Sequence, residues 1–222
     1  MIIVHHLNNS RSQRILWALE ELGVAYEIKR YQREPSMQAP ASLRAVHPLG
    51  KSPVITDGGT TVAESGAIVE YLLDTYGETS GLRPAKGTPE YRRYVYWLHF
   101  AEGSAMPPLV MKLVFQKIKS APMPFFARPI ARGIADKVLA AFVDPNLQRQ
   151  MAFMEADLAG GPWFAGAQFS AADIQMSFPV EAANARGALG ANAPRLKDWL
   201  ARAHARPAYQ RALERGGKYD YA

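Results

Sequence analysis

The sequence predicts two domains of different class, an α/β domain at residues 1–78 and an all-α domain at residues 89–222. In the first third of the chain, short apolar runs alternate with helical patterns, which favours a small sheet covered by helices. Glycine and proline then cluster without apolar periodicity, so residues 79–88 are expected to form a linker. Long helical patterns follow, and none of the later segments has a convincing strand pattern.

The N-terminal elements are expected in the order β-α-β-α-β-β-α. Apolar residues recur at helical spacing from Ile15 to Leu22 and stop before Gly23, a typical C-terminal stop signal. The stretch Asp57-Gly58-Gly59 between two short apolar runs predicts a hairpin. The predicted strands cover residues 2–4, 26–31, 54–55 and 60–62, and the predicted helices cover residues 15–22, 42–46 and 68–73.

The C-terminal helices are expected at residues 91–119, 134–158, 171–186, 194–203 and 208–215. A break is expected at Pro107-Pro108 and a bend near Pro145, because proline removes a backbone donor and clashes with the preceding turn. Ser170 and Asp173 have the spacing of a capping box, so Asp173 is interpreted as structural and not as a catalytic acid.

The composition excludes several classes of chemistry. The chain has no cysteine, which rules out disulfides, thiolate metal sites and cysteine nucleophiles. It contains neither a P-loop nor a G-x-G-x-x-G or H-E-x-x-H motif, and the adjacent His5 and His6 should point to opposite faces of a strand. We therefore expect no metal and no nucleotide cofactor.

Charge and hydropathy narrow the expected partners. The net charge is +6, but the basic residues are scattered, which favours acidic small molecules over nucleic acid. No window approaches 18 apolar residues and the N-terminus lacks a secretory pattern, so a cytoplasmic protein with no membrane partner is expected.

Ser10 lies in the turn between the first strand and the first helix. With Gln13 it has the capping-box spacing, so it could be an N-cap and nothing more. Alternatively, its hydroxyl at the positive end of the helix could stabilise a bound anion such as a thiolate. Lowering a thiol pKa by one unit requires about 1.4 kcal/mol of preferential anion stabilisation, which one hydroxyl and a helix terminus can supply.

Two further groups could hold a small zwitterionic peptide. At Ser52-Pro53, a cis bond would turn the Ser52 main chain toward a ligand that pairs as an added strand, although most such bonds are trans. Lys51 beside it could meet a carboxylate or simply be solvated. Glu64-Ser65 starts a helix, where the two residues could receive an ammonium and a carboxylate or act only as first-turn capping residues.

These motifs together resemble the cytosolic glutathione S-transferases. The resemblance covers essentially the whole chain and is strongest in VHHLNNSRSQRILWALEELGVAYE, HPLGKSPVITDGG, AESGAIVEYL and FSAADI. NNSRSQRILWALEEL and MPPLVMKLVF look most like the bacterial and fungal subgroup related to the yeast-type enzymes. The resemblance implies a thioredoxin-like N-terminal domain, an all-helical C-terminal domain and a homodimer.

The resemblance also implies roles for individual residues. Ser10, four residues before Arg14, matches the serine that activates the glutathione thiol in the serine-type classes. Asn8 and Asn9 crowd the same turn, and either could share or replace that role.

The glutathione-binding residues implied by the resemblance come from the later motifs. Pro53 matches the family's cis-proline, and Ser52 matches the residue whose main chain pairs with the cysteinyl part. Lys51 sits where a side chain often meets the glycine carboxylate, and Glu64-Ser65 matches the pair that holds the γ-glutamyl group.

The implied activity is conjugation of glutathione, as co-substrate, to small electrophilic apolar compounds, as in detoxification. Met106, Met111 and Phe115 are predicted to form an adaptable apolar wall for that second substrate, with ordinary core packing as the competing interpretation. Two other functions remain open. One is glutathione-dependent reduction of hydroperoxides or disulfides, and the other is a non-catalytic ligand carrier of the same fold.

Overall fold

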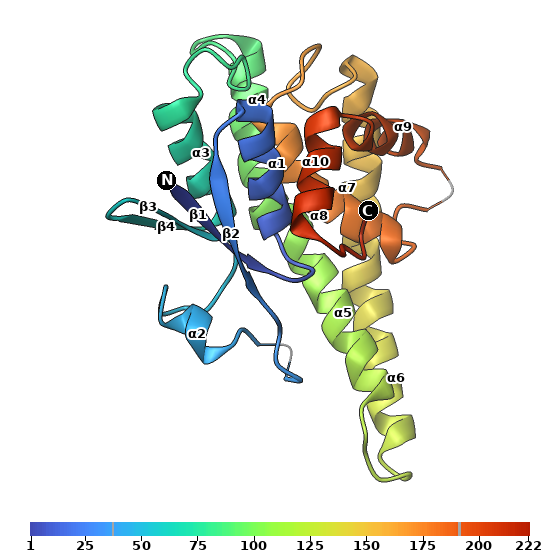
Figure 1. Cartoon of the computed structure of the whole chain (residues 1–222). Helices are drawn as coiled ribbons and strands as arrows, with labels where there is room; N and C mark the ends of the chain where they lie inside the picture. The colour runs from blue at the N-terminus through green and yellow to red at the C-terminus, as the bar shows by residue number, and fades with distance from the viewer. Residues whose placement is uncertain (37, 191) are drawn as a thin grey trace.

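A computed structural model describes residues 1–36, 38–190 and 192–222. Its N-terminal part contains a four-stranded sheet in the order β2-β1-β3-β4, in which β1 is parallel to β2 and antiparallel to β3 (Figure 1). The strands are β1 (Ile2–Leu7), β2 (Tyr26–Tyr31), β3 (Val54–Asp57) and β4 (Thr60–Ala63). The first strand extends beyond the predicted residues 2–4, because His5, His6 and Leu7 also pair with β2.

Three helices complete this domain, α1 (Ser12–Leu22), α2 (Ala41–Arg44) and α3 (Ser65–Tyr76). The predicted order β-α-β-α-β-β-α is therefore confirmed. α1 ends at Gly23, whose φ of 65° is easily adopted only by glycine and whose N–H donates to the carbonyl of Leu19. Along β1, Ile2 and Val4 belong to the large core that includes α1 and α3, whereas Leu7 packs with Leu43 of α2. The two faces of the sheet are thus covered by different helices.

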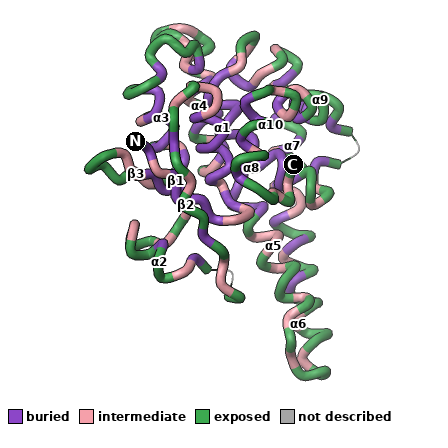
Figure 2. Tube along the Cα trace, in the orientation of Figure 1, coloured by how far each residue is buried: buried purple, intermediate pink, exposed green. Residues whose placement is uncertain are grey.

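The C-terminal part is helical, as predicted. Its helices are α4 (Pro89–Phe100), α5 (Met106–Ser120), α6 (Arg128–Val138), α7 (Asp144–Asp157), α8 (Ala171–Ala185), α9 (Pro194–His204) and α10 (Pro207–Gly216). The core is continuous across the two parts of the chain, and Figure 2 shows buried segments from α1 through α8. Trp17, Trp97 and Trp199 are among its largest fully buried side chains.

Proline interrupts the helices at the two predicted places. A π-helical turn, Ala101–Ala105, separates α4 from Pro107 and Pro108 near the start of α5, and another, Leu139–Val143, precedes Pro145. Because Pro108 has no N–H to offer the carbonyl four residues earlier, that of Ser104, the carbonyl needs another donor. The side chain of Gln150 supplies it at 2.8 Å.

Two capping predictions have different outcomes. At α8, the Ser170–Asp173 capping box is formed as predicted. At α1, the capping-box interpretation of Ser10 and Gln13 is wrong, because Arg11 occupies the N-cap position and makes no side-chain capping bond. The hydroxyl of Ser10 instead accepts from the backbone N–H of Ser12, at 3.2 Å.

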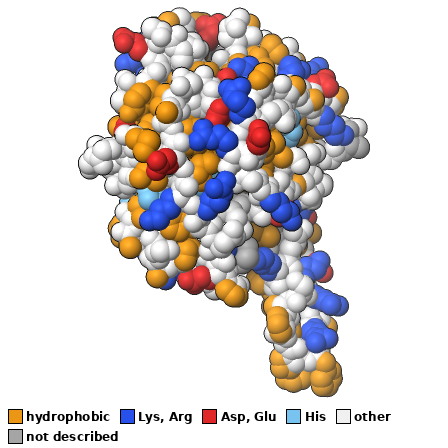
Figure 3. Space-filling view, viewed as in Figure 1, with side chains coloured by type: hydrophobic (Ala, Val, Ile, Leu, Met, Phe, Trp, Pro, Cys, Tyr) orange, Lys and Arg blue, Asp and Glu red, His pale blue; other side chains and the backbone are white. Residues whose placement is uncertain are grey.

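α5 and α6 form a hairpin that extends away from the rest of the molecule (Figure 1). Figure 3 shows hydrophobic side chains gathered at its end, with Lys and Arg side chains beside them. Its exposed apolar residues include Phe125, Phe126, Ile130 and Ile134. Within the described residues, no helix has the length and apolar character needed to cross a bilayer.

Candidate active site

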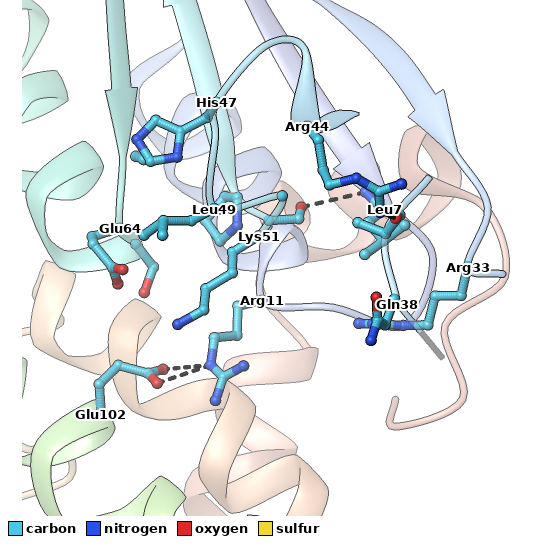
Figure 4. Close-up of a pocket in the computed structure, with 16 residues that line it drawn as sticks. Leu7, Arg11, Arg33, Gln38, Arg44, His47, Leu49, Lys51, Glu64 and Glu102 are labelled. Atoms are coloured by element: carbon cyan, nitrogen blue, oxygen red, sulfur yellow. Dashed lines mark hydrogen bonds and ion pairs between the residues drawn. The ribbon is translucent and has the colours of Figure 1, made fainter. Parts of the chain in front are cut away.

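A cavity of about 440 Å³ opens between the sheet domain and the start of the helical domain. Its size lies within the range of small-molecule sites. The cavity is rich in basic side chains, as Figure 4 shows. They are Arg11, Arg33, Arg44, Lys51 and His47. The acidic residues Glu64 and Glu102 also line it. An anionic ligand that also carries a cationic group suits this composition.

All five residues predicted to bind glutathione line this cavity: Lys51, Ser52, Pro53, Glu64 and Ser65. They come from two segments, the chain before β3 and the junction of β4 with α3. The Ser52–Pro53 peptide bond is cis. Since β3 begins at Val54, the main chain of Ser52 lies just outside the sheet and borders the cavity.

Glu64 and Ser65 form the N-terminal end of α3. Glu64 has a φ of 71°, a value uncommon for a residue with a side chain and often found at binding sites. The Ser65 hydroxyl accepts hydrogen bonds from Arg14, at 3.2 Å, and from Gln175, at 2.9 Å. The described part of the chain shows no acceptor for the hydrogen of Ser65 itself. That hydrogen and the first backbone N–H groups of α3 are therefore available to a ligand carboxylate.

Glu102 joins the cavity to a buried arginine. It accepts from Arg14, whose side chain has no exposed surface, and its two oxygens each lie 2.9 Å from Nε of Arg11. Burial by itself raises the pKa of Glu102, but Arg14 and Arg11 outweigh it, so this pKa is lowered. Glu102 is therefore ionised at neutral pH, and it helps to balance the two guanidinium groups beside the cavity.

Ser10 lies one hydrogen bond behind the cavity wall. Its side chain is buried, and its hydroxyl donates to Oγ of Ser52 at 3.3 Å. The Ser52 hydroxyl in turn donates to the carbonyl of His5, at 3.1 Å. On its other side, Oγ of Ser10 lies 2.7 Å from Oγ of Ser12. Rotation of one hydroxyl would direct the Ser10 hydrogen at a ligand atom beside Ser52.

Asn8 and Asn9 point elsewhere. They line a second cavity, of about 340 Å³, between β1, β2 and the C-terminal segment. Oδ1 of Asn8 accepts from the backbone N–H of Arg33, and Nδ2 of Asn9 donates to Asp220 at 2.6 Å. The structure therefore separates these two alternatives from the five residues around the first cavity.

The three residues predicted for the second substrate do not line either cavity. Met106 is buried within the core, and Met111 and Phe115 are partly buried and pack against it. Met106 is the first residue of α5 and directly follows the π-helical turn that carries Glu102. Core packing, the competing interpretation, describes Met106 in this structure.

Several residues of the site escaped sequence reasoning. Arg11, Glu102 and Gln175 carry no motif of their own, because their partners are far away in the sequence. The prolines that follow the π-helical turn were the one available signal near Glu102. π-helical turns often occur at functional sites. The sequence predicted a helix break at these prolines, but it did not predict that the break would place Glu102 beside the cavity.

Family comparisons agree on both parts of the chain. Residues 1–74 match the glutathione S-transferase N-terminal domain, and residues 131–202 match the glutathione S-transferase C-terminal domain. Glutathione S-transferase 3 of Schizosaccharomyces pombe is 38% identical over 97% of this chain and 88% of the relative. Glutathione S-transferase 1 of Saccharomyces cerevisiae is 34% identical over 90% of this chain and 88% of the relative.

Solved structures that resemble this chain are also glutathione S-transferases. The crystal structure of a glutathione S-transferase from Actinobacillus pleuropneumoniae has a TM-score of 0.80 and 33% identity, and covers 100% of this chain and 95% of that one. A sphingomonad glutathione S-transferase complexed with glutathione has a TM-score of 0.72 and 25% identity, over 97% of this chain and 98% of that one.

Proposed function

Because the chain belongs to the glutathione S-transferase family, we propose that it binds glutathione, stabilises its thiolate and transfers it to small electrophilic apolar compounds. The observation that carries the proposal is the single cavity lined by Lys51, Ser52, Pro53, Glu64 and Ser65. Glutathione has two carboxylates and one ammonium, and this wall offers separate partners for each of them.

We assign one part of glutathione to each of the two segments that supply these residues. Glu64 receives the ammonium of the γ-glutamyl end, while the Ser65 hydroxyl and the α3 N-terminus receive its carboxylate. The main chain of Ser52 pairs with the cysteinyl part, as an added strand would. The Lys51 side chain reaches into the cavity from the segment before β3 (Figure 4). We assign it to the glycine carboxylate.

This placement puts the cysteinyl sulfur near Ser52 and hence near Ser10. The Ser10 hydroxyl donates to the thiolate, and the cationic wall of the cavity favours the same charge. A free thiol has a pKa of about 8.5, so lowering it by two units requires about 2.7 kcal/mol of preferential stabilisation. Hydrogen bonds to charged groups contribute about 1.5–3 kcal/mol each, so Ser10 supplies a large share of this stabilisation.

The thiolate absorbance of bound glutathione tests the proposal. We expect the wild-type protein to lower the pKa of the bound thiol, and Ser10→Ala to raise it again by about 1–2 units with a parallel loss of kcat/KM. Asn8→Ala is the matched comparison, because Asn8 lies in the same turn but faces the other cavity. A larger loss for Asn8→Ala than for Ser10→Ala would move the thiol-activating role to Asn8.

The same proposal includes a cytoplasmic homodimer that acts in detoxification. Conjugation of a chloroaromatic compound, measured beside reduction of a hydroperoxide, separates transfer from peroxidase chemistry. Turnover of the hydroperoxide alone would favour the reductase, and glutathione binding without turnover of either compound would favour a carrier.

A further inference from the structure

A hydrogen-bonded row of side chains runs from His6, which borders the second cavity, to the wall of the first cavity. Nδ1 of His6 lies 2.8 Å from Oγ of Ser12, and Oγ of Ser12 lies 2.7 Å from Oγ of Ser10. Ser10 then contacts Ser52, at 3.3 Å. His6, Ser10 and Ser12 are all buried, so little solvent competes for these hydrogens.

The direction of these hydrogen bonds follows from counting hydrogens. A hydroxyl has a single hydrogen, and Ser52 donates its own to the His5 carbonyl, which can only accept. In the contact between Ser10 and Ser52, the hydrogen must therefore come from Ser10. Its hydrogen being used, Ser10 can only accept from Ser12.

The same count fixes the role of His6. If Ser12 donates to Ser10, then the short contact between Ser12 and Nδ1 of His6 requires the imidazole to donate. The competing acceptor for the Ser12 hydrogen, the carbonyl of Leu7, lies farther away, at 3.4 Å. Every hydrogen in the row then points toward the cavity.

We propose that His6 is a positioning residue for the thiol chemistry: its Nδ1–H donates to Ser12, Ser12 donates to Ser10, and the Ser10 hydrogen is thereby directed at the cavity. This inference rests on the proposed function, because it assigns Ser10 to the glutathione sulfur. In the opposite orientation, the Ser10 hydrogen would point to Ser12 and would be lost to a thiolate.

The electrostatic surroundings of His6 agree with this role. Burial, with a smaller contribution from Arg30, lowers the pKa of His6 to about 4. The imidazole is therefore neutral at pH 7 and carries one N–H, which the row of hydroxyls places on Nδ1. A hydroxyl that accepts from both the O–H and the N–H of Ser12 is polarised and becomes a stronger donor.

The chain provides a matched control at the neighbouring position. His5 is also buried and also bonded through Nδ1, at 2.9 Å to the hydroxyl of Tyr31. It lies on the other face of the sheet, where its side chain has no bond to Ser10 or Ser12. Replacing His5 therefore removes a similar buried imidazole without cutting the row.

The first measurement is the tautomer of His6 in the ligand-free protein, by long-range proton–nitrogen NMR of labelled histidine. Protonated Nδ1 and unprotonated Nε2 are expected near neutral pH. A hydrogen on Nε2 would overturn the inference whatever happens with glutathione. This readout is independent of the proposed function.

The second measurement is the pKa of the bound glutathione thiol in variants of the row. His6→Phe and Ser12→Ala should each reduce the thiolate fraction at a pH below that pKa by about fivefold, the effect of one lost hydrogen bond. His6→Asn should restore it, because the amide N–H can replace Nδ1–H, and His5→Phe should leave it at the wild-type value. Thermal unfolding of each variant checks the fold.

A double variant gives the sharpest comparison. Because His6→Phe and Ser12→Ala cut the same row, the double variant should shift the thiol pKa no further than one of them alone. Additive shifts, or no shift in either single variant while Ser10→Ala still loses the thiolate, would overturn the role of His6 and leave the proposed function intact. Loss of glutathione binding by the wild type, or no effect of Ser10→Ala, would instead count against the proposed function.

Discussion

Arg14 is a guanidinium group with no exposed side-chain surface, and its charge must be balanced inside the protein. Glu102 provides the balancing charge, and Ser65 accepts a further hydrogen bond from Arg14 at 3.2 Å. This contact links the buried arginine to the end of α3 that borders the cavity. Residues in the core thus orient a hydroxyl that we assign to the ligand.

Glu102→Gln should lower the free energy of unfolding by about 2–4 kcal/mol at pH 7, because a buried arginine loses its carboxylate partner. Chemical denaturation measures this change. Glu90→Gln, at an exposed position in α4, is the control and should change stability by less than about 0.5 kcal/mol.

The pH dependence of that difference has a definite sign. The folded-state pKa of Glu102 is lowered from 4.5, so its ionised form contributes stability above pH 4.5, and this contribution is lost as the pH falls through the folded-state value. The gap between wild type and Glu102→Gln should therefore close only in acid. A gap that stays constant down to pH 3 would contradict the ion-pair explanation.

At the scale of elements, the start of α8 is fixed by one buried carboxylate. α8 starts with a complete capping box, in which Asp173 accepts from both the N–H and the hydroxyl of Ser170. Asp173 also accepts from the backbone of Phe164 and from the indole of Trp199, both at 2.9 Å. One carboxylate therefore joins α8 to α9 and to the loop before α8.

Asp173→Ala should destabilise the protein by at least about 3 kcal/mol, since it removes a helix cap and leaves buried donors without an acceptor. Asp198→Ala, at an exposed position in α9, is the matched comparison and should have a small effect. Equal losses of unfolding free energy in the two variants would contradict this interpretation of Asp173.

At the scale of the whole molecule, α1 lies between the sheet and the helical domain. Glu21 of α1 binds Arg206 through two hydrogen bonds, at 2.6 and 2.8 Å, and Asn9 is bonded to Asp220 near the C-terminus. These contacts join residues from opposite ends of the chain. The two domains consequently share one continuous core, and the first cavity is held between them.

A third cavity lies between α3 and α4, and it marks the surface on which we expect the homodimer to form. This cavity, of about 640 Å³, is lined by Ala67, Tyr91, Val95 and Leu98 among other residues, and also by the acidic residues Glu64, Glu70 and Glu102. Ala67→Glu should shift the protein from dimer to monomer, because it adds a negative charge at an exposed position beside these glutamates without removing core packing. Light scattering after size-exclusion chromatography measures the mass.

Ala152→Glu, at an exposed position on α7, adds the same charge elsewhere and should leave the dimer intact. If both variants remained dimeric, the interface would lie on another face, and the exposed apolar end of the α5–α6 hairpin would be the next surface to test.

The sequence by itself determined the order of elements, the helix stop at Gly23, the capping box at α8 and the breaks before Pro107 and Pro145. These features depend on periodicity, glycine conformation and the missing N–H of proline, all of which act over a few residues. The five residues predicted to bind glutathione could also be named, because each belongs to a short local motif.

Only the tertiary structure decided what surrounds those residues. Glu102 lies beside Arg11 and Arg14 because the helical domain packs against α1, and no local pattern encodes that contact. The capping-box interpretation of Ser10 is excluded for the same reason: the Ser10 hydroxyl bonds to Ser12, which in turn contacts His6 on β1. Local motifs identify the residue types of the site. The partner of each buried polar group depends on which distant segments pack against it, because a buried donor or acceptor must form a hydrogen bond with a group that the fold places beside it.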